Sequence, residues 1–206
     1  MANILVIATH NRKKAGEMVQ ILQARFPSLE VRTLADYPSA PEPEETGTTY
    51  AENAAIKSES AVLATGEWCV ADDAGLEVDG LDGAPGLYSK RFGGEDLPFP
   101  EKMALILNAL EGLPLASRRA RFRCCVAFSA PGVLTETFEA TCEGSIADGP
   151  RGKGGFGYDP IFLPDDAPGR AMAELTALDK HQISHRGKVL AMFAEALPSL
   201  TGIGNL

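Results

Sequence analysis

Apolar positions along the chain follow two different periods, and their alternation predicts an α/β fold. Residues 4–8 form an unbroken apolar run, as expected of a strand that is buried on both faces. The following segment places Met18, Ile21 and Leu22 at helical spacing and is interrupted at Pro27. The chain is therefore expected to open with a strand, a tight turn and a helix.

The same two periods continue over the rest of the chain. Thr49 and Glu52 form a capping box in front of an alanine-rich helix that should end at Gly66, and residues 68–71 indicate a short buried strand. The other expected elements are a strand over 29–34, a proline-rich loop after it, a largely irregular stretch over 75–94, a helix over 100–110, an antiparallel hairpin made of 121–128 and 134–142, and a helix that begins after Ser184. Neither a repeat nor a linker divides them, so we expect a single α/β domain over residues 1–206.

The charge balance is acidic, which argues against two classes of partner. With 19 Lys and Arg against 28 Asp and Glu, the 206-residue chain carries a formal charge of −9. Nucleic acids and anionic membrane surfaces call for a basic face, so neither is an expected partner. Apolar runs are far shorter than the ~18 residues of a membrane helix. No basic leader is visible at the N-terminus, and a cytoplasmic protein is expected.

The cysteines and histidines do not show the spacing of a zinc site. The four cysteines contain no C-x-x-C pair and are expected to be buried free thiols, at Cys69, Cys124, Cys125 and Cys142. The three histidines show no H-E-x-x-H spacing. Any metal ion is therefore expected to be bound by oxygen ligands.

Three cations at the start of the first helix suggest an anion site. Arg12, Lys13 and Lys14 lie where the helix dipole is already positive and where acidic residues are normally favoured. Together with free backbone N–H groups after a buried strand, they fit a phosphate chain. His185 and Arg186 likewise place basic residues at the start of the last helix, where acidic residues are normally favoured. The alternative is a solvated basic turn.

Acidic residues supply the matching half of a metal–triphosphate site. Asp72 and Asp73 follow the strand predicted over 68–71, at the edge where open α/β sheets bind ligands. Glu45 and Glu44 at the end of the proline-rich loop and Glu52 on the next helix could complete an oxygen-rich Mg²⁺ site. Taken alone, the Asp pair is equally compatible with a turn.

A glycine-rich segment, residues 152–160, contains a G-x-G-x-x-G match but does not open a helix, so a dinucleotide site is not expected. It also lacks the Ser or Thr that follows the lysine of a phosphate-binding Walker A loop. Phe156 and Asp159 would suit a planar base, by stacking and by hydrogen bonding. The alternative is an aromatic corner packed in the core. Lys180 and His181 could face either a ligand or water.

In order and spacing, seven segments resemble the inosine/xanthosine triphosphate pyrophosphatase family, the dITP/XTP diphosphatases that clear deaminated purine nucleotides. The resemblance covers residues 4–198 and implies a homodimeric, Mg²⁺-dependent hydrolase that converts XTP, ITP and dITP to the monophosphate and pyrophosphate. It also implies an elongated mixed β-sheet flanked by helices, with an active-site cleft between two lobes. The matching segments are 9–14, 44–47, 52–54, 72–76, 83–86, 155–160 and 184–187.

The resemblance also implies roles for single residues. Glu45 and Asp73 would be metal ligands, and Asp73 would accept the proton of the attacking water. The triphosphate would be bound by Thr9, His10, Asn11, Arg12, Lys13, Lys14 and Lys57. The residues that would bind the rest of the substrate are Asp72, Ala74, Phe156, Gly157, Tyr158, Asp159, Lys180, His185 and Arg186, with Phe156 stacked on the base. Two departures stand out: Ala74 replaces a serine found in many relatives, and His10 stands where glycine is frequent.

Two other functions stay open at this point. One is a pyrophosphatase of similar fold that acts on modified pyrimidine nucleotides. The other is a nucleotide-binding module without catalysis. A panel of nucleotide substrates distinguishes the first, and metal–nucleotide binding without product would indicate the second.

Overall fold

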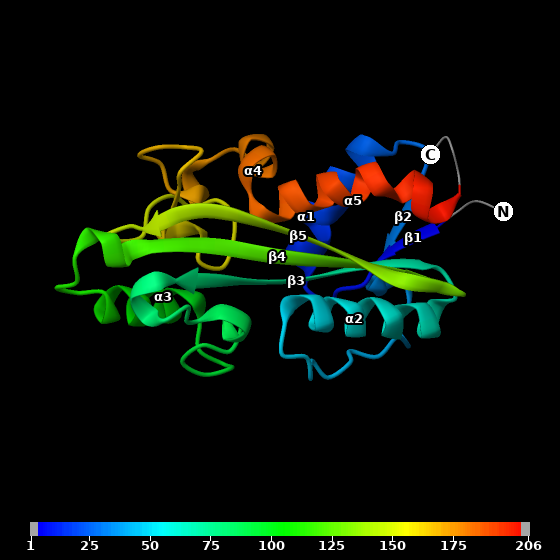
Figure 1. Ribbon diagram of the computed structural model, residues 1–206, viewed down its shortest axis with the longest axis horizontal. Helices are drawn as coiled ribbons and strands as arrows, with labels where there is room; N and C mark the ends of the chain where they lie inside the picture. Colours follow the sequence, from blue (N-terminus) through cyan, green and yellow to red (C-terminus); the bar gives the residue numbers. More distant parts are fainter. Residues whose placement is uncertain (1–3, 203–206) are drawn as a thin grey trace. The chain divides into compact units, whose positions relative to one another are not determined.

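The computed structural model describes residues 4–202, and in this range the chain forms a mixed β-sheet and five α-helices (Figure 1). None of the helices in this range is both long and apolar enough to cross a membrane. The strands are β1 (Ile4–Ile7), β2 (Glu30–Thr33), β3 (Trp68–Val78), β4 (Arg119–Ala130), β5 (Val133–Ile146) and β6 (Phe162–Pro164). The α-helices are α1 (Arg12–Arg25), α2 (Tyr50–Thr65), α3 (Phe99–Ala109), α4 (Ala177–Ile183) and α5 (His185–Thr201).

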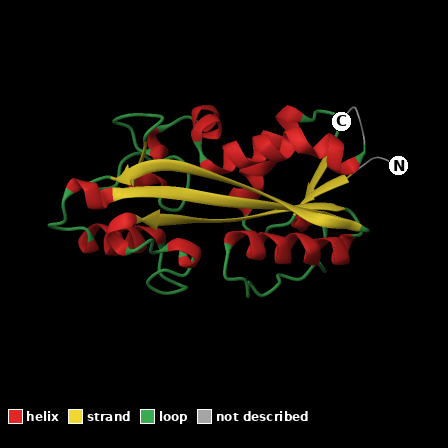
Figure 2. Ribbon diagram, in the orientation of Figure 1, coloured by secondary structure: helices red, strands yellow, loops and turns green. Residues whose placement is uncertain are grey.

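The strands, drawn in yellow in Figure 2, are hydrogen-bonded in the order β2-β1-β3-β4-β5-β6. β1 pairs in parallel with both β2 and β3, whereas β5 and β6 are antiparallel. β4 and β5 are neighbours joined by residues 131–132 alone, a connection short enough only for an antiparallel hairpin. The expected mixed α/β sheet and its hairpin are confirmed.

Helix α2 begins and ends where the sequence predicted. The Thr49 hydroxyl accepts the N–H of Glu52, and the Glu52 carboxylate accepts the N–H of Thr49, which completes the capping box. At the other end, Gly66 adopts φ +71°, the left-handed conformation that glycine reaches without strain. Local chemistry alone therefore determines both ends of this helix.

Strand β3 corrects the expectation of a short strand over 68–71. It continues to Val78, so Asp72 and Asp73 lie within it, and residues 75–78 are strand rather than irregular chain. Pairing with β1 extends only over Trp68–Val70, because β1 ends at Ile7, while β4 flanks β3 on its other side. The two aspartates therefore lie just beyond the end of the parallel neighbour.

The chain divides into two compact units. This division agrees with the two lobes that the resemblance implied, whereas the cleft between the lobes stays a prediction. Unit 1 contains residues 4–73, 124–140 and 186–202, and unit 2 contains residues 74–123 and 141–185. In unit 1, α2 covers one face of the sheet and α1 and α5 cover the other (Figure 1). Phe193 of α5 contacts the rings of Phe128 and Phe138, with centroids 5.5 and 5.9 Å apart.

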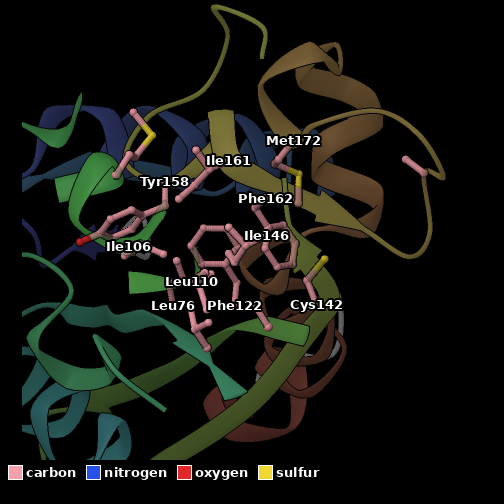
Figure 3. Close-up of a cluster of buried hydrophobic side chains, with 14 of the residues drawn as sticks. Leu76, Ile106, Leu110, Phe122, Cys142, Ile146, Tyr158, Ile161, Phe162 and Met172 are labelled. Atoms are coloured by element: carbon pink, nitrogen blue, oxygen red, sulfur yellow. The ribbon is translucent and has the colours of Figure 1, made fainter. Parts of the chain in front are cut away.

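Unit 2 has a hydrophobic core of its own, which joins β3, β4, β5 and β6 to helix α3 (Figure 3). Leu76, Ile106 and Phe162 are completely buried in it. Tyr158, from the glycine-rich segment, also lies in this core and donates its hydroxyl to the Ser89 carbonyl at 2.9 Å. The core therefore anchors the segment that was expected to meet the base.

The cysteines of both units are free and buried, as predicted. Burial raises the pKa of the Cys69 thiol to about 11 and moves the pKa of the Cys124 thiol further above its ordinary value. At neutral pH both side chains are therefore thiols and pack as small apolar groups.

Replacing Leu76 by alanine should lower the free energy of unfolding by roughly 2–5 kcal/mol, because a fully buried leucine leaves a cavity in the unit 2 core. The matched control is Leu134→Ala, at a side chain that is 86% exposed, which should change it by no more than about 0.5 kcal/mol. Denaturant titration measures both values. Equal losses for the two variants would contradict the assigned core.

Candidate active site

Helix α1 starts with a cap that the sequence analysis did not foresee. The Asn11 side-chain oxygen accepts the N–H groups of Lys13 and Lys14 at 3.0 and 3.2 Å, and the Asn11 N–H donates to the Thr9 hydroxyl at 3.2 Å. The expectation that these helix N–H groups are free is therefore wrong for Lys13 and Lys14, because Asn11 already satisfies them. No acidic residue occupies the first turn. The positive charge of the turn is left to the side chains, which at Arg12 and Lys13 are exposed, and the neighbouring His10 is exposed as well.

Asp72 and Asp73 contact opposite sides of the sheet, as successive strand residues must. Asp72 is 1% exposed, and its Oδ2 accepts Arg186 Nε and Nη2 at 3.1 and 2.8 Å. Lys14 Nζ lies 3.4 Å from the same oxygen. All three cation contacts come from α1 and α5, the helices on one face.

The cations of α1 and α5 keep Asp72 ionised although it is buried. Burial alone would raise the pKa of its carboxyl group, but Lys14, Arg186 and Lys57 outweigh that effect and hold the pKa well below its ordinary value. Arg186 is itself buried and donates its third nitrogen, Nη1, to Glu17 at 2.9 Å. The Asp72 Oδ1 atom is buried and has no hydrogen-bond partner among residues 4–202.

Asp73 faces α2 and shares a lysine with the proline-rich loop. Lys57 Nζ lies 2.9 Å from Asp73 Oδ1 and 3.0 Å from Glu45 Oε1. Burial raises the pKa of Asp73, and although Lys57 and Lys14 act in the opposite direction, the pKa stays above its ordinary value. Burial likewise lowers the pKa of Lys57, but the neighbouring carboxylates raise it more, and its pKa is higher than usual. Lys57 is therefore a cation at neutral pH.

Of the three glutamates considered for the acidic cluster, Glu45 is the one that reaches it. Glu52 uses one carboxylate oxygen to accept the Thr48 and Thr49 N–H groups, so its negative charge serves the helix cap. The structure thus assigns Glu52 to the helix cap, and its expected part in a metal site stays a prediction. Glu44 is exposed in the same loop as Glu45.

The acids present fit a magnesium-like cation. Within residues 4–202, no group of three or more His, Cys, Asp or Glu side chains forms a ready-made metal site. Asp73 and Glu45 do approach one nitrogen from two segments, which means that a single cation can contact both carboxylates. Mg²⁺ typically takes one or two carboxylates and fills its remaining positions with water and substrate phosphate.

Unit 2 places three of the expected base-binding residues together. Asp159 Oδ2 accepts Lys180 Nζ at 2.7 Å and the Phe156 N–H at 2.9 Å, and Lys180 Nζ lies 4.8 Å from the centre of the Phe156 ring. Asp159 and Lys180 are almost fully buried, at 3 and 5% exposure. Gly155 adopts φ +66°, and a Cβ there would overlap the Asp159 carboxylate, so glycine is required. The arrangement presents a half-buried ring beside an ammonium group.

The remaining expected residues occupy different settings. Tyr158 is 2% exposed and holds the Ser89 carbonyl, which makes it part of the core. The His185 ring is buried and stacks on Phe122, with centroids 4.7 Å apart. Ala74 and Gly157 are half-buried, Ala74 in β3 and Gly157 in the glycine-rich turn.

A family model described as the Ham1 family matches residues 5–196 of this chain. The chain belongs to the Ham1 family. A relative from Geobacillus kaustophilus, named dITP/XTP pyrophosphatase, is 46% identical over 199 residues, which cover 96% of each chain. A Bacillus subtilis relative of the same name is 44% identical, over 93% of this chain and 96% of the relative. The structure of the Staphylococcus aureus Ham1 protein matches with a TM-score of 0.83 and 38% identity, over 96% of this chain and 99% of that one.

Two residues of this Ham1 site were missed by sequence reasoning. Glu17 accepts Arg186 Nη1, and Asn53 lies between the Glu45 loop and Asp73. Asn53 stands four residues before Lys57, so both share one face of α2, and that spacing could have signalled it. Glu17 had no such signal, because its partner lies 169 residues away in the chain.

The Asp72–Arg186 pair of this Ham1 protein should behave as one energetic unit. Arg186→Gln and Asp72→Asn should each cost roughly 3–5 kcal/mol of unfolding free energy, because each leaves the opposite buried charge without its main partner. The double variant should cost less than the sum of the two, by about 1 kcal/mol or more. Denaturant titration of the wild type, the two single variants and the double variant completes this double-mutant cycle. Strictly additive losses of unfolding free energy would contradict the pairing.

The same pair sets the expected response to acid. Because the folded pKa of Asp72 is depressed, the unfolded state takes up the proton first. The stabilisation from Asp72 is therefore complete above the unfolded pKa of about 3.9 and is lost as the pH falls below it. Wild-type stability should decline more steeply than that of Asp72→Asn in this range.

Proposed function

We propose that this chain hydrolyses the non-standard purine nucleotides XTP, ITP and dITP to the nucleoside monophosphate and pyrophosphate, with Mg²⁺ as cofactor. The observation that carries the proposal is the buried Asp73 carboxylate, which shares Lys57 with Glu45. The relatives from Geobacillus kaustophilus and Bacillus subtilis are named for this activity. Removal of deaminated purines from the nucleotide pool is the corresponding role.

Asp73 and Glu45 would hold the metal ion, which supplies charge neutralisation at the phosphates when bound. Asp73 also orients the attacking water and accepts its proton. A carboxylate whose pKa is raised by burial is a better proton acceptor than an exposed one. Asp72 stays ionised, because Arg186 and Lys14 both contact its Oδ2 atom, and its role is structural.

Cations of unit 1 would stabilise the leaving pyrophosphate. Lys57 and Lys14 lie at the aspartates, and the exposed side chains of Arg12 and Lys13 follow the turn formed by Thr9, His10 and Asn11. Fixed positive charges at the place where negative charge accumulates lower the barrier without reorganisation during the reaction. Little covalent chemistry is required of the protein.

The unit 2 residues would select the base. Phe156 would stack on the purine, and Lys180, whose ammonium group can only donate hydrogen bonds, would favour the 6-oxo group of hypoxanthine and xanthine. Adenine carries an amino group at position 6, which is also a hydrogen-bond donor, so it could not accept a hydrogen bond from Lys180 there. We also propose that the protein is a cytoplasmic homodimer, as the family resemblance implies.

A substrate panel tests the function. Pyrophosphate and orthophosphate release are measured from dITP, XTP, dGTP, dATP and dUTP, with Mg²⁺ and with EDTA. Metal-dependent pyrophosphate from dITP and XTP, with little from dATP or dGTP, is expected. Preference for dUTP would favour a pyrimidine pyrophosphatase, and binding without any product would favour a nucleotide-binding module.

The Asp73→Asn variant serves as the catalytic control for this panel. It should fold and should lose roughly 10²–10⁴-fold in kcat, because an amide cannot accept the proton of the water. Retained turnover with an unchanged circular dichroism spectrum would refute the assigned base.

Phe156→Ala should raise KM for dITP by about tenfold or more, since stacking on an aromatic ring contributes roughly 1–3 kcal/mol per base. Its kcat should change much less than its KM, because Phe156 touches no reacting atom in this account. Steady-state kinetics with dITP separate the two parameters. An unchanged KM would remove Phe156 from the base site.

A further inference from the structure

Helix α2 joins the loop of Glu45 to Asp73 at two successive turns. At one turn, Lys57 contacts Glu45 Oε1 at 3.0 Å and Asp73 Oδ1 at 2.9 Å. One turn earlier, Asn53 accepts the N–H of Gly47 at 2.8 Å and donates to Asp73 Oδ2 at 3.5 Å. The two residues of α2 thus form parallel bridges between the same loop and the same carboxylate.

The Asn53 amide can be oriented in only one way. A backbone N–H such as that of Gly47 is a donor, so the atom that faces it must be the side-chain oxygen. The NH₂ group then points to Asp73, which as a carboxylate only accepts. With its side chain buried at 3% exposure, Asn53 is held by these contacts rather than by water.

The loop rests tightly on the start of α2 at Gly47. A Cβ at this position would lie 2.6 Å from both Asn53 Oδ1 and Glu52 Cβ, closer than carbon atoms pack. Only glycine therefore lets the loop backbone approach the Asn53 amide. This approach fixes the chain two residues after Glu45.

We propose that Asn53 is a positioning residue that aligns Glu45 and Asp73 for a divalent cation, an inference that rests on the metal-dependent function proposed above. Lys57 carries a charge that compensates the same carboxylates and so opposes a metal ion. Asn53 is neutral, and it joins the Asp73 carboxylate to the loop backbone two residues after Glu45 without compensating the charge of either carboxylate. Of the two bridges, only the one through Asn53 aligns the ligands without competing for them.

The test measures Mn²⁺ binding in the absence of nucleotide, by calorimetric titration of the full chain. Asn53→Ala should weaken Mn²⁺ binding by about tenfold or more, the usual effect of losing a residue that orients metal ligands. The Mg²⁺ concentration for half-maximal dITP hydrolysis should rise by a similar factor. At saturating Mg²⁺, KM for dITP should change by less than about twofold, since Asn53 contacts no part of the substrate in this account.

Ser58→Ala is the matched control. Ser58 is fully buried on the same helix, and its hydroxyl bonds to the Ser129 hydroxyl at 2.7 Å and to the Ala55 carbonyl at 3.1 Å. It should lower the melting temperature and leave Mn²⁺ affinity unchanged. If Ser58→Ala weakens Mn²⁺ binding as much as Asn53→Ala, then the effect is general loosening of α2 and the proposal is overturned.

If Asn53→Ala fails to fold, Gly47→Ala is a second variant that tests whether the bridge through Asn53 affects Mn²⁺ binding. It strains the loop against Asn53 and leaves the Asp73 side chain in place, so it should also weaken Mn²⁺ binding. Wild-type affinity in either folded variant would overturn the proposal. Wild-type protein that binds Mn²⁺ but hydrolyses no nucleotide would refute the proposed function alone, whereas wild-type protein that does not bind Mn²⁺ would overturn the role of Asn53.

Discussion

Two adjacent carboxylates inside a buried strand are the constraint on which the rest of unit 1 depends. Because successive strand residues point to opposite faces, Asp72 and Asp73 cannot share one set of cations at close range. Asp72 is met by Lys14 of α1 and Arg186 of α5 on one face, and Asp73 by Lys57 of α2 on the other. The helices on both faces thus contribute charge as well as apolar surface.

The two environments give the carboxylates different chemistry. Asp72 is almost completely buried, and two nitrogens of the Arg186 guanidinium group donate to its Oδ2, so its pKa falls and it stays ionised as a fixed structural charge. Asp73 is also buried but has one lysine and one amide as neighbours, and its pKa rises. Neighbouring acids whose pKa values move in opposite directions are a common basis for dividing structural and catalytic roles.

Much of this organisation could be predicted from the sequence, where local chemistry decides it. The capping box of Thr49 and Glu52 and the terminal Gly66 defined α2. The anion site indicated by the cations after β1 stays a prediction. The length of β3 could not be predicted, because Asp72 and Asp73 interrupt the apolar pattern and the strand continues through pairing with β4. The caps formed by Asn11 and Glu52 show how a polar side chain near a site can be used by the backbone instead. The contacts of Asn53 with Gly47 and Asp73 could not be predicted, because they depend on how the loop folds against α2.

In the proposed reaction, water attacks the α-phosphorus while the cations of unit 1 stabilise the departing pyrophosphate. Hydrolysis of dITP in ¹⁸O-enriched water, followed by mass spectrometry of both products, tests this most directly. The account predicts that the label enters dIMP and that pyrophosphate stays unlabelled. Label in pyrophosphate would contradict it, because the monophosphate would then be the leaving group, and Lys14 and Lys57 would stabilise the wrong product.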